Sequence, residues 1–359
     1  MIVNPQNLRG IYVGFNTLFN KALTTVDPLY KQIATVTPST TDSETYAWLG
    51  DIPGMREWIG DREIQNLTAS GYTIRNKDFE LTIGIDRNAI EDDKISLYNP
   101  SVEMLAQSAA VHPDELVFAL LASGFAAKCY DGKPFFSDKH EIGKKVVSNM
   151  GTAPLSLEAY IAARAGMMSL TNAKGRALNI IPDTLVVPPA LEAKARDILV
   201  ADFINGTRNT MQGTAKPLVV PQLAGHDSAW YLLSTSRPLK PLIYQERKKA
   251  KFVSKTAETD DNVFMKKQFL YGADSRGNAG FGFWQMAFSG DGAGKDNKGG
   301  SSDGGNGAKQ VVIQKLLIPV DLKKIKDLQQ LLELLKEVED FANANESEET
   351  ADDPEAVTV

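Results

Sequence analysis

Apolar and polar residues alternate strictly from residue 79 to residue 86, which is the spacing of a strand with one covered face. The apolar members of this row are Phe79, Leu81, Ile83 and Ile85. Tyr72 and Ile74 alternate in the same way, and the polar run at residues 76–78 between the two rows is typical of a turn. The pattern therefore predicts a long β-hairpin over residues 72–86.

Two early stretches carry apolar residues at the three- and four-residue steps of a helix. A short helix is expected around Asn7 to Thr24, inside a segment that is otherwise typical of an extended arm. A longer stripe covers residues 99–124, where Pro113 interrupts it and the acids Asp114 and Glu115 favour a restarted helix. This second stretch is either one helix with a break or two helices in line.

Helices and strands are mixed in the next part of the chain. Ser156 is a typical N-cap for a helix that follows it, and Thr184 to Val187 has the composition of a short buried strand. Pro188 stops that strand, and a helix is expected over residues 190–201, which suggests an α/β lobe. Strand patterns return between residues 216 and 289.

The composition changes abruptly at Ser289. Eight glycines fall in the eighteen residues 290–307, and such a chain loses more entropy on ordering than its side chains recover, so a flexible linker is expected. A strand is expected over residues 310–320, and an amphipathic helix over residues 321–342. The apolar stripe of this helix includes Leu328, Leu331, Leu335 and Val338. The stripe has two open interpretations, pairing with a partner helix or packing against the protein's own body.

The charge of the chain is concentrated at its end. Of 39 basic and 45 acidic residues, 8 and 15 lie in residues 289–359, which leaves the body with 31 and 30 and close to neutral. Residues 343–359 are acidic and expected to be disordered. No broad basic footprint for nucleic acid, no apolar run long enough for a bilayer and no secretory signal is present, so synthesis in the cytoplasm is expected. The single cysteine excludes an intramolecular disulfide.

Candidate chemistry is sparse. The three histidines are His112, His140 and His226, and none has the four-residue helical spacing of a metalloprotease, so metal binding is not expected. Cys129 with His140 and Asp131 or Asp138 offers a thiol, a base and an orienting acid, but a buried cysteine beside a polar turn is the favoured interpretation. The acids at 91–93 are typical of a solvated turn. We therefore predict no catalytic, cofactor-binding or metal-binding residues.

Several long motifs occur in an order that identifies a family. They include WLGDIPGMREWIGDREIQNL, GYTIRNKDFELTIGIDR, SAAVHPDELVFALLASGF, PDTLVVPPALEAKARDIL, DDNVFMKKQF and GNAGFGFWQMAF. Together they closely resemble the major head subunit of Mu-like phages, over residues 1 to about 288. The resemblance implies an α+β, Hong-Kong-97-type tailed-phage capsid fold, and a structural protein without catalysis. Residues from 289 onward match nothing in that family.

The resemblance also implies a division of the chain and a set of partners. The expected segments are an arm (1–45), an extended hairpin loop (46–95), a peripheral domain with its spine helix (96–178), an axial domain (179–230), strands returning to the peripheral domain (231–288), the linker (289–308), the strand and helix (309–342) and the acidic tail (343–359). The expected partners are copies of the chain as hexamers and pentamers, a separately encoded scaffold, a portal and packaged double-stranded DNA, with no membrane. The expected location is the virion, after synthesis in the host bacterial cytoplasm.

An intersubunit surface is expected around the extended loop. Exposed apolar rows and aromatic pairs are a hazard in a monomer but are buried when copies pack together. The candidate residues are Trp48, Arg56, Trp58 and Arg62 with Tyr72, Phe79, Leu81 and Ile83. The alternative is that both tryptophans fill their own subunit's core. Two further functions stay open: a shell of the same fold that encloses a cargo enzyme, and a cysteine hydrolase built on Cys129 and His140.

Overall fold

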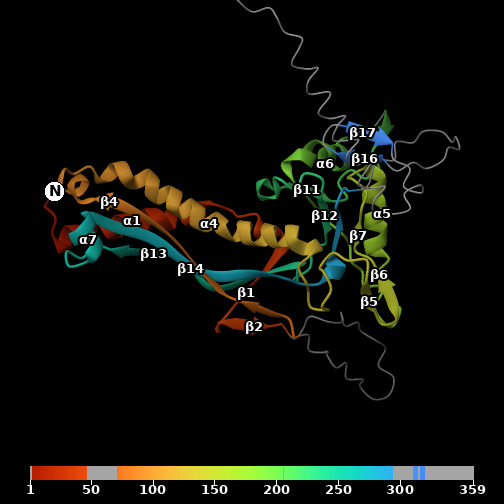
Figure 1. Ribbon diagram of the computed structural model, residues 1–359, viewed down its shortest axis with the longest axis horizontal. Coiled ribbons are helices and arrows are strands. Elements are labelled where there is room, and N and C mark those ends of the chain that lie inside the picture. Colours follow the sequence, from red (N-terminus) through yellow and green to blue (C-terminus); the bar gives the residue numbers. More distant parts are fainter. Residues whose placement is uncertain (1, 47–70, 205, 294–309, 314–315, 320–359) are drawn as a thin grey trace, which may run out of the picture. The chain divides into compact units, whose positions relative to one another are not determined.

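The computed structural model describes residues 2–46, 71–204, 206–293, 310–313 and 316–319. The chain divides into two units, residues 1–296 and 297–359. The first unit holds nearly all of the described structure, and it consists of a long limb joined to a rounder lobe (Figure 1). The predicted residues Trp48, Arg56, Trp58 and Arg62, and the C-terminal stripe at 328–338, lie outside the described residues.

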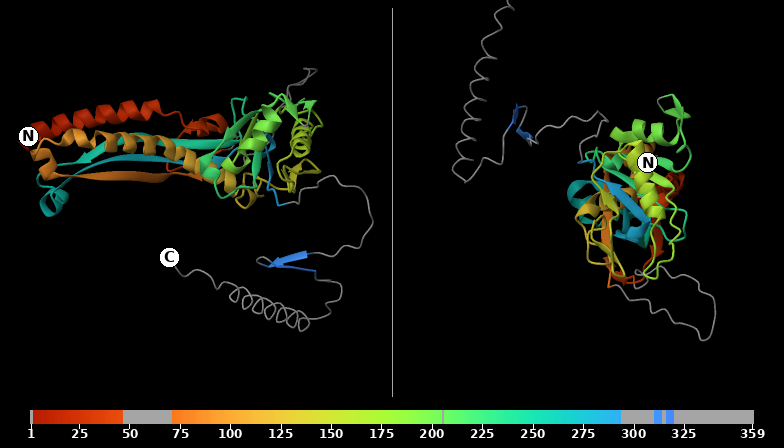
Figure 2. Two further views of the ribbon diagram at one scale, coloured as in Figure 1. Left: turned by 90° about the horizontal axis from the view of Figure 1, so that it is seen from above. Right: turned by 90° about the vertical axis from the view of Figure 1, so that its right-hand side faces the viewer.

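The limb is a four-stranded sheet covered by two helices. Its strand order is β1 (Ala34–Pro38), β13 (Leu242–Lys255), β14 (Gln268–Phe281) and β4 (Lys77–Asp86). β13 and β14 form a long antiparallel pair, β4 is antiparallel to β14, and β1 is parallel to β13. Helix α4 (Asn99–Ala122) runs along the sheet with α1 (Pro5–Thr25) beside it, and α7 (Asp261–Lys266) closes the far end between β13 and β14 (Figures 1 and 2).

The lobe is built on a five-stranded sheet of order β11 (Lys216–Val219), β8 (Thr184–Val187), β12 (Trp230–Leu233), β15 (Ala287–Gly290) and β7 (Met150–Gly151). Helix α5 (Leu157–Met168) packs near β15, and α6 (Glu192–Leu199) packs on β8 and β11. Smaller pairs are β5 (His140–Ile142) with β6 (Lys145–Val147) and β9 (Phe203–Ile204) with β10 (Thr207–Arg208). The strands β8 and β12 are fully buried, which explains their unbroken apolar composition.

Short elements join these layers. They are α2 (Tyr30–Ile33), β2 (Ser43–Thr45), β3 (Thr73–Arg75), α3 (Arg87–Glu91) and the 3-10 turns η1 (Ile95–Tyr98), η2 (Ser123–Phe125), η3 (Pro189–Leu191), η4 (Pro221–Leu223) and η5 (Trp284–Met286). Three apolar clusters hold the first unit together: one along the limb, one in the lobe, and one at the junction where the C-terminal half of α4 meets both sheets. The junction cluster includes Phe118, Phe135, Phe281 and Trp284.

The predicted hairpin over residues 72–86 is wrong, although both of its strands exist. β3 pairs with β2, and β4 pairs with β14, so the two strands are consecutive but belong to different sheets. Asn76 does not form a turn tip. It is buried between the strands, where its side-chain amide donates to Thr41 O at 2.6 Å and its Oδ1 accepts from Gln245 Nε2 at 2.6 Å. These long-range partners give no local pattern in the sequence.

The predicted break at Pro113 is also absent, because α4 is one helix from Asn99 to Ala122. Asp114 does not start a second helix. Its buried carboxylate accepts from the backbone N–H groups of Leu29 at 3.1 Å and Tyr30 at 2.6 Å, and so satisfies the start of α2. The acid that was interpreted as a local helix signal therefore fixes the N-terminal segment to the spine helix.

Other predictions are confirmed in outline and corrected at their edges. The arm helix is longer than expected, and Ser156 caps α5 by accepting from Ala159 N at 3.1 Å. β12 and β15 complete the sheet of β8, so only β13 and β14 return to the limb. Ser289 and Gly290 belong to buried β15 and not to the linker. The single strand expected over residues 310–320 is two antiparallel strands in the second unit, β16 (Gln310–Ile313) and β17 (Leu316–Pro319). The other domain boundaries stay predictions.

Candidate functional site

Four of the predicted intersubunit residues lie in the described structure, and they differ in how much of their surface is exposed. Tyr72 is half-buried between the junction and lobe clusters, and its hydroxyl accepts from the backbone N–H of Phe281 at 2.8 Å. Burial raises the pKa of Tyr72 to about 12. Gly280, the residue before Phe281, has no room for a side chain, because a Cβ there would lie 2.0 Å from Ile74 Cδ1. Most of the Tyr72 side chain thus contacts its own subunit.

The alternating row on β4 faces the helices of its own limb. Phe79 is half-buried with its ring centroid 4.2 Å from that of His112 on α4, and Ile83 packs against the limb cluster. Leu81 is different, because 43% of its surface is exposed. Of the predicted β4 residues, Leu81 is therefore the one that keeps substantial apolar surface for another subunit.

A stronger apolar surface lies on α7, at the tip of the limb. Phe264 and Met265 are 80% and 75% exposed, beside the basic pair Lys266 and Lys267. Side chains of this size rarely stay in water without a reason when they sit together. The sequence carried a signal for this surface in the run VFMKK, where two large apolar residues precede two lysines, but it was not among the predicted site residues.

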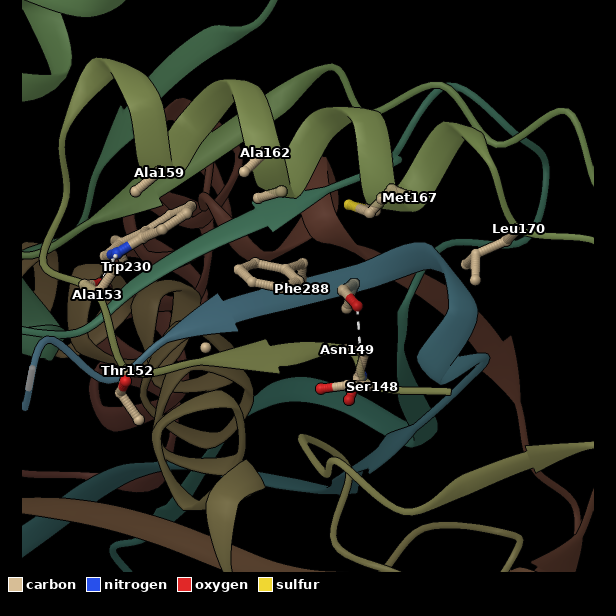
Figure 3. A pocket seen from close by; sticks show the side chains of 14 residues that line it. Ser148, Asn149, Thr152, Ala153, Ala159, Ala162, Met167, Leu170, Trp230 and Phe288 are labelled. Atoms are coloured by element: carbon tan, nitrogen blue, oxygen red, sulfur yellow. Dashed lines mark hydrogen bonds between the residues drawn. The ribbon is translucent and has the colours of Figure 1, made fainter. Parts of the chain in front are cut away.

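An apolar hollow of about 330 Å³ lies beneath α5, against β7 and β15. Figure 3 shows Trp230, Phe288 and Met167 along it, with the small residues Ala159 and Ala162 facing them from the helix. Among the described residues that line it, none carries a titratable side chain. The hollow can hold apolar groups, and no described acid or base lines it to activate the hydroxyls of Ser148 and Thr152.

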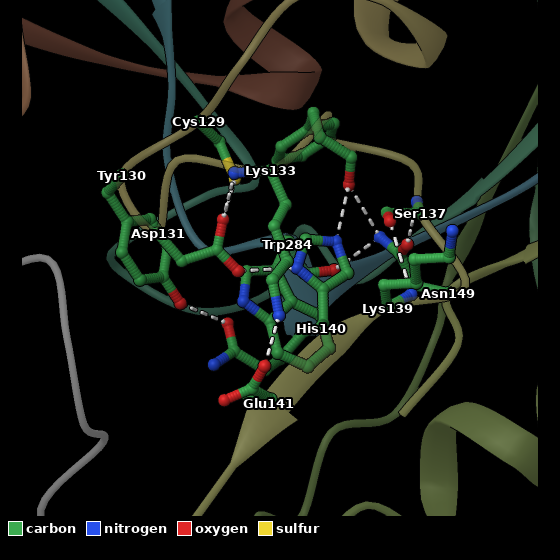
Figure 4. A network of polar contacts seen from close by, with 12 residues as sticks. Cys129, Tyr130, Asp131, Lys133, Ser137, Lys139, His140, Glu141, Asn149 and Trp284 are labelled. Atoms are coloured by element: carbon green, nitrogen blue, oxygen red, sulfur yellow. Dashed lines mark hydrogen bonds and ion pairs between the residues drawn. The ribbon is translucent and has the colours of Figure 1, made fainter. Parts of the chain in front are cut away.

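The cysteine cluster is the chemically richest place in the described part of the chain (Figure 4). Cys129 and Asp131 lie in the loop after η2, and His140 begins β5. Cys129 Sγ is 3.1 Å from Asp131 Oδ1, and His140 Nδ1 is 2.6 Å from Asp131 Oδ2. The carboxylate of Asp131 thus lies between the thiol and the imidazole. Asp138, the alternative orienting acid, is exposed and is not part of this cluster.

This order does not suit a thiol nucleophile, and Cys129 is buried, as the favoured interpretation expected. A catalytic thiol needs its base beside it, whereas Cys129 donates to the carboxylate. Burial, with the charge of Asp131 next in effect, raises the pKa of the Cys129 thiol far above its usual range. Burial also acts to raise the pKa of Asp131, but hydrogen bonds from His140, Lys133 N and Cys129 outweigh it and lower that pKa. With no cation beside it, a thiol held in this way stays protonated and does not act as a nucleophile.

The acidic turn at residues 91–93 behaves as expected for a solvated surface. Arg87 Nε contacts Glu91 Oε1 at 2.9 Å, and Lys94 Nζ contacts Asp92 Oδ2 at 3.0 Å. Both pairs are exposed, and exposed pairs of this kind contribute little stability.

Comparison with known proteins decides what this fold is for. The family model described as "Mu-like prophage major head subunit gpT" matches residues 8–154, 151–223 and 221–297, which is most of the chain. The chain belongs to the Mu-like major head subunit family. It is 38% identical over 285 residues to the Mu-like prophage FluMu major head subunit of Haemophilus influenzae, covering 79% of this chain and 73% of that one. It is 36% identical over 287 residues to the major capsid protein of Escherichia phage Mu, covering 80% and 74%.

Solved structures agree with this membership. A chain from the procapsid of bacteriophage JBD30 matches with a TM-score of 0.54 and 39% identity, over 80% of this chain and 75% of that one. A phage-related protein from Bordetella bronchiseptica matches with a TM-score of 0.50 and 10% identity, over 77% and 96%, and it supports the fold alone. The fold is that of Hong-Kong-97-type tailed-phage capsid subunits, as predicted from the motifs.

The predicted function is confirmed at the level of the family. This Mu-like head subunit is a structural protein of a phage capsid, and the family favours a phage head over a compartment that encloses an enzyme. Within the described ranges, no helix combines the length and the apolar composition that a membrane crossing requires.

Proposed function

We propose that this Mu-like head subunit assembles with copies of itself, as hexamers and pentamers, into an icosahedral shell around double-stranded DNA. The observation that supports this most strongly is the 39% identity, over 80% of the chain, to a subunit of the JBD30 procapsid. The subunit functions by packing against copies of itself and has no catalytic role. The same proposal includes synthesis in the host cytoplasm, a separately encoded scaffold during assembly, and a portal at one vertex.

The limb supports the proposal because it presents apolar side chains that its own fold does not cover. Phe264 and Met265 lie at its tip, Leu97 and Met104 are 72% and 68% exposed near the start of α4, and Leu81 is on the edge strand β4. Burial of such groups by neighbours is the main source of favourable free energy in subunit association. Each contact is modest, so the closed shell is held by the sum of many contacts.

The charge distribution fits a container for DNA without sequence recognition. Residues 1–288 carry 31 basic and 30 acidic residues, so the body of the subunit opposes neither its own packing nor the enclosed phosphates. The acidic surplus belongs to residues 289–359. An outward position for that segment avoids placing negative charge against packed DNA, and a role in clamping or decorating the shell is our proposal for it.

The test is co-expression of the full chain with the scaffold encoded beside it, followed by sedimentation and electron microscopy. We expect closed shells of one size class that contain hexameric and pentameric capsomers. Particles purified from an induced lysogen are expected to contain double-stranded DNA, whereas a cargo enzyme in place of DNA would favour the compartment alternative. A chain that stays a monomer at high concentration, with and without scaffold, would refute the proposal.

A further inference from the structure

The Cys129 cluster brings three kinds of metal-ligand atom to one point. Cys129 Sγ, a carboxylate oxygen of Asp131 and a ring nitrogen of His140 all lie within 4.8 Å of one another. Two of the three residues are buried, and Asp131 is exposed. Sulfur, nitrogen and oxygen donors that converge from a loop and a strand are a donor set typical of transition metals.

The surroundings of His140 fix which nitrogen faces the cluster. Its Nε2 is 3.2 Å from the carbonyl oxygen of Phe135, and a carbonyl only accepts, so Nε2 carries the proton. In a neutral imidazole, Nδ1 then holds a lone pair, which points at Asp131 Oδ2 from 2.6 Å. Two acceptors at this distance need a proton or a cation between them, which is a second proton on the ring, a proton on the Asp131 carboxyl or a metal cation.

Other contacts hold the donors in place. The His140 ring is fully buried and stacks on Trp284, with centroids 4.0 Å apart and planes 6° apart (Figure 4). The backbone N–H of Lys133 donates to Asp131 Oδ1 at 3.0 Å. A histidine that donates its second N–H to a backbone carbonyl, and a ligating carboxylate that accepts from the backbone, are the outer contacts that usually orient metal ligands.

We propose that Cys129, Asp131 and His140 bind one zinc-type divalent cation. Thiolate and imidazole disfavour magnesium and calcium, which take oxygen ligands. In a tetrahedral zinc site, bonds of about 2.0 to 2.3 Å place neighbouring donors roughly 3.3 to 3.5 Å apart, so the 2.6 Å contact between His140 and Asp131 opens by less than about 1 Å. A tetrahedral site takes a fourth ligand, which water would supply because Asp131 is exposed.

From the sequence, these residues form only a possible catalytic set, because metal binding was judged from the spacing of the three histidines to one another. The cluster instead combines His140 with the single cysteine and an acid, which lie eleven and nine positions before it in the chain. A bound cation ties the loop after η2 to β5 and to Trp284 of the junction cluster. The inference does not depend on assembly, because all three ligands come from one subunit.

The test uses the full chain, as unassembled subunit and as shell, with cobalt as a spectroscopic substitute for zinc. We expect one Co²⁺ per chain, a thiolate-to-cobalt charge-transfer band, displacement by Zn²⁺, and a higher melting temperature of the subunit with zinc than with chelator. Cys129→Ser removes the band and weakens binding by at least about 100-fold, in line with the effect of losing ligand-sphere groups. The matched control His226→Gln changes an exposed histidine outside the cluster and keeps all four properties.

His140→Gln is a second variant, but it alters a fully buried ring and can unfold the chain. Cys129→Ser and the wild-type cobalt spectrum therefore decide the question on their own. A wild-type chain that shows no thiolate band and no zinc-dependent melting shift overturns the proposal, and a proton then bridges His140 and Asp131. Equal cobalt binding by Cys129→Ser and the wild type also overturns it.

Discussion

The exposed side chain of Phe264 allows a quantitative test of how the limb takes part in assembly. Complete burial of a phenylalanine contributes about 1.5 to 3 kcal/mol, and Phe264 is 80% exposed in the isolated subunit. Its burial by a neighbour therefore contributes about 2 kcal/mol for each subunit added. Because about 1.4 kcal/mol is a factor of ten in an equilibrium constant, Phe264→Ser is expected to raise the critical concentration for shell formation roughly 30-fold.

The assay is a concentration series of purified subunit and scaffold, followed by light scattering and sedimentation. The unassembled variant should keep the wild-type melting temperature, because the side chain makes few contacts inside its own subunit. Phe264→Leu keeps most of the apolar area and serves as the control, with an expected change of only a few fold. If Phe264→Ser assembles at the wild-type critical concentration while its fold is intact, the tip of the limb is not an assembly contact and the reasoning is wrong.

Three further changes test the interior. Asp114→Ala leaves two N–H groups at the start of α2 without an acceptor. It should lower the free energy of unfolding, measured by chemical denaturation, by about 2 to 4 kcal/mol. Asp114→Asn keeps one acceptor and should lower it less. Gly280→Ala places a Cβ 2.0 Å from Ile74, so it should lower the free energy of unfolding by about 1 to 3 kcal/mol and with it the melting temperature. Gly10→Ala in α1 meets nothing within 4 Å and should stabilise the subunit by up to about 1 kcal/mol. Burial acts to raise the pKa of Asp183, but hydrogen bonds from Thr235 and Ser236 outweigh it and lower that pKa. The carboxylate therefore stabilises the fold above the usual aspartate pKa, and this stabilisation is lost as pH falls through the depressed value. Asp183→Asn should show a flatter loss of stability on acidification.

The Gly10 comparison separates two reasons for a glycine in a helix. A subunit that becomes more stable but assembles poorly would show that a neighbour packs closely against α1. A subunit that becomes more stable and assembles normally would show that the position is simply free. For Asp183, the wild type should be more stable than the variant at neutral pH, and the difference should shrink as pH falls through the depressed pKa. A stability difference that does not change with pH would contradict the assigned role.

Sequence reasoning succeeded where the signal is local. The serine at 156, the apolar run of β8 and the stripe of α4 each determine their own element, and each is found where it was expected. It failed where the partner of an element is distant. The residues of β4 alternate as in a hairpin, yet β4 pairs with residues 268–277, which no local pattern reveals. Asp114 was interpreted by its neighbours along the helix, but its hydrogen-bond partners lie 84 and 85 positions away.

The candidate sites follow the same rule. The sequence named Cys129, Asp131 and His140 as a possible group, but not that the carboxylate would lie between the other two, which changes the chemistry from nucleophile to ligand set. It selected Leu81 together with Phe79 and Ile83 because all three share one period. Their packing separates them, because Phe79 lies against His112 of α4 and Ile83 packs against the limb cluster, whereas Leu81 stays 43% exposed.

The parallel pairing of β1 with β13 has a consequence for how the subunit is made. Residues 34–38 find their partners only at residues 242–246, and β4 finds its partner only at residues 268–277. The limb sheet therefore cannot close on the ribosome until most of the polypeptide has emerged, and contacts at such long sequence separation form slowly. A ribosome that stops before Phe281 therefore releases a fragment whose limb sheet is incomplete.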